Sequence, residues 1–93
     1  MQEELQYISN GRSGYVVYFD GEREARFFYE FGGGDCLAII YIPLIKEWES
    51  QTGINVERRP EILSFIAQQV ILDQAPNGKF KIQEHTITIL KGE

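Results

Sequence analysis

The chain has 93 residues and a formal net charge of −5, and 43% of its residues are hydrophobic. This length and balance predict one globular domain over residues 1–93 and argue against a disordered chain. Most of the nine Lys and Arg residues are scattered, which disfavours nucleic acid and an anionic membrane surface as partners, because both require concentrated positive charge.

The single cysteine cannot form an internal disulfide and gives no sign of an oxidising compartment. The first residues, MQEEL, are acidic and lack the basic-then-apolar order of a secretory signal. The longest apolar run, residues 36–45, has ten residues, whereas a spanning helix requires about 20. We therefore expect a cytoplasmic protein that does not cross a membrane.

Three segments at the start of the chain, residues 4–9, 15–19 and 23–31, have the composition of β-strands. Asn-Gly and Asp-Gly pairs between them favour tight turns, as in successive hairpins. In the third segment apolar side chains alternate with charged ones, so one face holds Ala25, Phe27, Tyr29 and Phe31.

The register of the second hairpin decides which residues share that apolar face. A two-residue turn at positions 20–21 would place it beside the even-numbered positions of the preceding strand, whereas a three-residue loop at 19–21 places it beside Tyr15 and Val17. A slip of one residue turns every side chain to the other face. We favour the three-residue loop, because it gathers more apolar surface on one face. It turns three residues to the opposite face: Val16, Tyr18 and Phe28.

Three glycines at positions 32–34 precede the apolar segment 36–42. A phosphate-binding loop requires a helix whose N-terminus points at the ligand. Here β-branched and aromatic residues follow, and Asp35 adds a negative charge where phosphate would bind, so we predict a hairpin loop. Segment 36–42 is apolar at every position, which predicts a central strand covered on both faces.

Two helices are expected next. Pro43 suits the first turn of a helix that contains Trp48, and Gly53 stands where a left-handed cap would end it. The second helix is predicted over residues 60–74. Its broad apolar face holds Ile62, Leu63, Ile66, Ala67, Val70 and Ile71, and a separate narrow stripe holds Phe65 and Leu72.

The last segment, residues 79–90, changes its apolar phase near positions 84–85, which predicts a bulge or a turn there. Strands and helices are grouped rather than alternating, as in α+β folds. We predict an antiparallel β-meander of about four strands, two consecutive helices, then a C-terminal bulged strand or hairpin.

Cys36 and His85 are the only residues of their kinds. A thiol nucleophile requires a base within hydrogen-bond reach, and no spacing rule links these positions. Zinc usually has four protein or water ligands, and the acidic residues do not cluster in the sequence. We predict no catalytic, cofactor or metal site, while a thiol enzyme that uses Cys36 stays open as a third hypothesis.

Surplus apolar surface is the more informative feature. The sheet's second face and the extra helical stripe exceed what one core requires, unless the first helix and the C-terminal strands cover both. Exposed apolar patches commonly mark interfaces, and the commonest form is a symmetric homodimer. We predict a small acidic non-enzymatic domain that binds another protein and also itself. Its candidate interface residues are Val16, Tyr18, Phe28, Phe65 and Leu72.

The alternative is a small-ligand carrier or sensor with a pocket between the aromatic sheet face and the second helix. Its candidate pocket residues are Phe27, Tyr29 and Phe31, and the competing explanation is that these rings fill the core.

Overall fold

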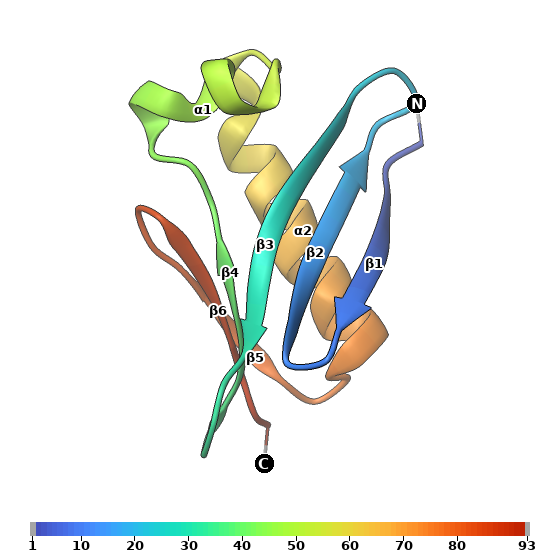
Figure 1. The fold of residues 1–93 in the computed structure, drawn as a ribbon, viewed down its shortest axis with the longest axis vertical. Coiled ribbons are helices and arrows are strands. Elements are labelled where there is room, and N and C mark those ends of the chain that lie inside the picture. Colours follow the sequence, from blue (N-terminus) through green and yellow to red (C-terminus); the bar gives the residue numbers. More distant parts are fainter. Residues whose placement is uncertain (1, 93) are drawn as a thin grey trace.

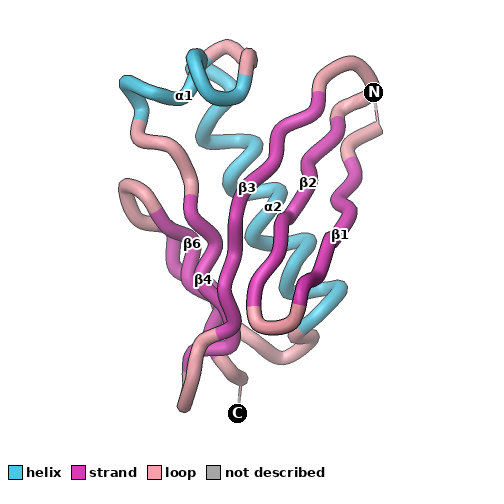
Figure 2. Tube along the Cα trace, viewed as in Figure 1, coloured by secondary structure: helices cyan, strands magenta, loops and turns pink. Residues whose placement is uncertain are grey.

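The computed structural model describes residues 2–92, which form one six-stranded antiparallel sheet with the order β1-β2-β3-β4-β6-β5 (Figures 1 and 2). The strands are β1 (Glu4–Asn10), β2 (Ser13–Phe19), β3 (Glu24–Phe31), β4 (Cys36–Tyr41), β5 (Lys79–Ile82) and β6 (Thr86–Leu90). Between β4 and β5 the chain forms α1 (Ile45–Thr52), the short 3-10 helix η1 (Val56–Arg58) and α2 (Arg59–Gln74). The α+β class is confirmed, with a C-terminal hairpin.

The C-terminal hairpin is part of the same sheet as the meander. β6 pairs with β4, so the hairpin does not form a separate layer, and β5 is an edge strand of the sheet. A turn, not a bulge, accounts for the phase change, because the Gln83 amide donates to the Thr86 carbonyl at 2.8 Å. The sheet is therefore wider than a four-stranded meander.

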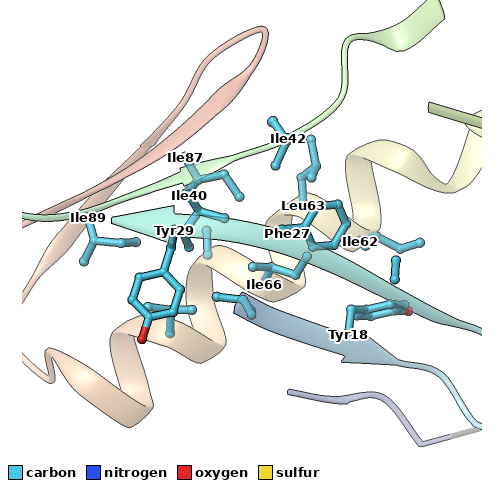
Figure 3. Close-up of a cluster of buried hydrophobic side chains, with 14 of the residues drawn as sticks. Tyr18, Phe27, Tyr29, Ile40, Ile42, Ile62, Leu63, Ile66, Ile87 and Ile89 are labelled. Carbon is cyan, nitrogen blue, oxygen red and sulfur yellow. The ribbon is translucent and has the colours of Figure 1, made fainter. Parts of the chain in front are cut away.

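Helix α2 lies across one face of this sheet (Figure 1). The core lies between them, and Figure 3 shows Ile40, Ile89 and Tyr29 toward one end of it and Tyr18 and Ile62 toward the other. The predicted broad face of α2 is confirmed, because five of its residues are buried: Ile62, Leu63, Ile66, Ala67 and Val70.

The preferred register of the β2–β3 hairpin is wrong. Val16 pairs with Phe27 and Tyr18 with Ala25, so the even positions of β2 face α2 together with the aromatic face of β3. The strands are joined by four residues, in which the Asp20 carboxylate accepts hydrogen bonds from the amides of residues 22 and 23 at 2.9 and 2.7 Å. We chose the register by comparing the apolar surface on each face, and that comparison does not include the hydrogen bonds by which Asp20 closes this longer turn.

β4 lies in the sheet interior as predicted, but α2 covers only one of its faces. Ile40 and Ile42 are buried toward the helix, whereas Tyr41, which stands between them, points to the opposite face and is exposed. On that face the Tyr41 ring stacks on Phe28 and both remain partly exposed, so the expected cover on both faces is not observed within residues 2–92.

Helix α1 begins at Ile45, two residues after Pro43, with Leu44 as its N-cap. Its end is as predicted, because Gly53 adopts a left-handed conformation (φ 72°) that favours glycine. Trp48 is fully buried in the core.

Candidate functional site

The sheet face opposite α2 carries a row of four large apolar side chains, one from each of β1 to β4. Ile8 pairs with Tyr15, and Tyr15 pairs with Phe28. The Tyr15 and Phe28 rings meet edge-on at 5.8 Å, and Phe28 stacks on Tyr41 at 5.9 Å. These four side chains, hereafter the aromatic row, are between 37% and 44% exposed.

Charged residues flank the centre of the aromatic row. Arg26 and Glu30 stand two positions before and after Phe28, and the alternation of a strand puts all three on the open face. Arg26 Nε lies 3.5 Å from Glu24 Oε2, and both side chains are more than half exposed. Tyr41 Oη donates to Glu30 Oε1 at 2.5 Å, and this bond raises the pKa of Tyr41.

A second candidate site lies on the helix side of the sheet. A cavity of about 210 Å³ separates the last turns of α2 from the sheet, near the chain reversals that end β1 and β3. Tyr29 and Phe31 line it from β3, and Ser9 lines it from β1. Its lining is otherwise mainly apolar.

The predicted interface residues do not form one surface. Val16 and Tyr18 are buried in the core, and Phe65 is half-buried with its ring edge-on to Tyr18 at 5.9 Å. Phe28 is exposed at the centre of the aromatic row, and Leu72 is 69% exposed on α2, on the other side of the sheet.

Sequence reasoning missed the other members of the aromatic row: Ile8, Tyr15 and Tyr41. The register of the β2–β3 hairpin could have revealed Tyr15. In the two-residue turn that we rejected, as in the observed hairpin, odd-numbered positions of β2 pair with even-numbered positions of β3. That turn would therefore have placed Tyr15 on the open face with Phe28.

Two of the three predicted pocket residues, Tyr29 and Phe31, line the cavity between the sheet and α2. Phe27 does not, because its ring is buried and stacks on Trp48 at 6.0 Å.

The structure keeps Cys36 and His85 apart. Cys36 begins β4 and pairs with Leu90, whereas His85 lies in the turn at the opposite end of the β4–β6 pair. Cys36 Sγ is half-buried and donates to the Ala38 carbonyl at 3.6 Å. Within residues 2–92, no group of three or more His, Cys, Asp or Glu side chains could hold a metal ion. The glycines at 32–34 form the β3–β4 loop, as predicted.

Away from the two candidate sites, buried charged residues connect the start of α2 to neighbouring loops. Asp20 is buried and pairs with Arg58, whose guanidinium also donates to Tyr18 Oη at 3.3 Å. Arg59 is buried and donates to the carbonyls of residues 43 and 84. Both arginines stand at the start of α2, so they anchor the helix to the loops around it.

No protein-family model, curated protein or solved structure matches this chain. Across residues 2–92, no helix combines the length and the apolar character that crossing a bilayer demands. The geometry gives two candidate sites, which are the open face with its aromatic row and the cavity beneath α2.

Proposed function

We propose that this chain is a small acidic, non-enzymatic protein-binding domain that acts through the open face of its sheet, and that its partner there is a second copy of itself. The aromatic row carries this proposal. The solvated face of an antiparallel sheet usually presents polar residues, whereas this one presents four adjoining large apolar side chains. Contiguous exposed apolar surface commonly marks an interface. We place the protein in the cytoplasm as part of the same proposal, since its single cysteine gives no sign of an oxidising compartment.

The order of charges along β3 favours a second copy as the partner. Arg26, Phe28 and Glu30 share one face, with the positive charge directly before the ring and the negative charge after it, and Glu24 beyond Arg26 pairs with it. Consider a twofold axis that passes over Phe28, between two stacked sheets and perpendicular to their strands. It stacks Phe28 on Phe28 and places each Arg26 over the Glu30 of the other copy. The face is therefore complementary to itself, as an isologous interface requires.

The area of the open face limits how strongly two copies can associate. Six strands about 4.8 Å apart and about 20 Å long present a face of about 480 Å². A typical stable interface buries about 800 Å² on each partner. Because the face is small, we expect a weak, reversible dimer that forms at high local concentration.

Charge exchange tests the proposal directly. Arg26→Glu and Glu30→Arg should each weaken self-association about tenfold or more in sedimentation equilibrium, because each places like charges over one another. An equimolar mixture of the two variants should recover the dimer, since each mixed pair again has opposite charges at both contacts.

A matched control is Leu72→Ser, which changes an exposed apolar residue away from the open face and should leave the dimer intact. A chain that sediments as a monomer at about 1 mM would refute self-association. Equal weakening in the mixture and in the separate variants would refute the proposed twofold arrangement.

A further inference from the structure

The cavity between α2 and the sheet has the volume of a small-molecule site. At about 210 Å³ it exceeds the roughly 150 Å³ at which a buried apolar cavity in a protein binds benzene. It is smaller than the pockets of about 300–1,000 Å³ that hold drug-sized ligands. One six-membered ring with a small substituent fits this volume.

The walls of the cavity select for an apolar ligand. Val16 and Ile40 line its sheet side with Ile89, and Val70 lines its helix side, and all four side chains are buried. A buried apolar surface is poorly hydrated, so a ligand that replaces the water beside it gains binding free energy.

Two hydroxyl groups in contact with each other interrupt these walls. Ser9 Oγ lies 2.8 Å from Tyr29 Oη, although the two residues come from β1 and β3 with β2 between them. Gly14 of β2 pairs with both residues and has no side chain to separate them. Each hydroxyl can donate one hydrogen bond and accept more, so the pair retains capacity for one ligand hydroxyl.

A ligand would enter the cavity beside Phe31. Phe31 lines the cavity and is 54% exposed, with its ring edge-on to Tyr29 at 5.4 Å. A ligand ring that enters beside Phe31 would meet an aromatic edge and then the buried Tyr29, whose hydroxyl contacts the exposed Ser9.

We infer that this cavity binds a small phenol-like compound, with the ring against the apolar walls and the hydroxyl bonded to the Ser9–Tyr29 pair. The site is separate from the aromatic row, because Tyr29 and Ser9 line the cavity beneath α2 whereas Phe28, next to Tyr29 in β3, points to the other face. Binding here does not depend on self-association.

Titration of the full chain with p-cresol, followed in two-dimensional amide NMR spectra, tests the inference. We expect saturable shifts at the amides of Ala38, Val70 and Gln74, with a Kd of about 0.1–1 mM for a ligand of this size. Toluene, which matches p-cresol without the hydroxyl, should bind about tenfold more weakly. The absence of saturable shifts at these amides, or equal affinity for the two compounds, would overturn the inference.

Two variants distinguish binding in the cavity from a nonspecific response of the protein to either compound. Ser9→Ala should preserve the fold and reduce the preference for p-cresol over toluene, because one hydroxyl of the pair is lost and only that of Tyr29 remains. Leu72→Ser lies outside the cavity and should bind both compounds as the unmodified chain does. A preference for p-cresol that is unchanged in Ser9→Ala would show that the hydroxyl pair does not recognise the ligand.

Discussion

Arg58 Nη1 donates to Asp20 Oδ2 at 2.7 Å, and this contact ties the β2–β3 turn to the start of α2. The Asp20 side chain is only 3% exposed, and its other oxygen accepts the two backbone hydrogen bonds that close the turn. One carboxylate therefore shapes the hairpin and attaches it to the helix. Because the turn sets the register, Asp20 also determines that Phe28 lies on the open face.

The first prediction concerns the protonation of Asp20. The hydrogen bond from Arg58, followed by the backbone amide of Arg23, lowers the pKa of Asp20 from 3.8 to about 2. A carboxyl group whose pKa is lower in the folded state stabilises the fold above its unfolded pKa, and this stabilisation is lost as the pH falls toward about 2. Asp20→Asn retains an acceptor for the turn and loses the charge, so it should lower the free energy of unfolding at pH 7 by about 1–3 kcal/mol.

Urea unfolding at pH 7, 4 and 2 checks this prediction. The difference between the unmodified chain and Asp20→Asn should be nearly constant from pH 7 to about pH 5 and should shrink between about pH 4 and pH 2. A difference that does not change with pH would show that the Asp20 charge does not stabilise the fold.

The second prediction concerns the close approach of β1 and β2 at Gly14. A Cβ atom added there would lie 1.9 Å from the Ile8 carbonyl oxygen, so the strands must separate to admit it. Gly14→Ala should destabilise the fold by about 1–3 kcal/mol, as overpacking does, and should speed amide hydrogen exchange in β1. Gly33→Ala is the control, because a Cβ there meets nothing within 4 Å. Equal stability of the two variants would contradict the proposed steric role.

The third prediction compares two residues that the sequence assigned to one stripe of α2. Phe65 packs on Tyr18, whereas Leu72 is exposed. Phe65→Glu should lower the free energy of unfolding by about 2–4 kcal/mol, because a charge would replace a ring in a half-buried contact. Leu72→Glu should change it by less than about 0.5 kcal/mol. Thermal unfolding of both variants separates these outcomes, and a similar loss in both would contradict the structure.

Local patterns predicted the helices and most strands. The spacing of Ile62, Ile66 and Val70 reports the buried face of α2, because a helix returns to the same side about every 3.6 residues. Gly53 marks the end of α1 for a similarly local reason, since few other residues adopt its left-handed conformation. Such features depend on neighbours in the sequence and require no knowledge of the tertiary contacts.

Features that depend on distant contacts could not be predicted in this way. The pairing of β6 with β4 joins segments about 50 residues apart, and nothing in either segment specifies the other. The Arg58–Asp20 contact, which supports the observed turn, spans 38 positions. The cavity beside Tyr29 depends on how closely α2 approaches the sheet, which the identity of the lining residues does not determine.

The last prediction concerns the buried charge of Arg59. Its guanidinium packs over Trp48, with Cζ 5.8 Å from the ring centroid, and Nη2 donates to the Pro43 and Glu84 carbonyls at 2.9 and 2.8 Å. Nε is buried and has no partner within residues 2–92, and burial lowers the pKa of the side chain. Desolvation therefore opposes the two hydrogen bonds and the contact with the ring.

Arg59→Met decides which effect is larger. Replacing a buried ion with an apolar side chain can be neutral or stabilising when its partners are replaced as well. Here both carbonyls would remain, and each acceptor left without a donor costs about 1–3 kcal/mol unless water reaches it. We expect Arg59→Met to lose about 1–3 kcal/mol and to exchange the Ile42 amide faster, since this amide donates to the neighbouring His85 carbonyl. A variant as stable as the unmodified chain would show that the desolvation of Arg59 cancels its contacts.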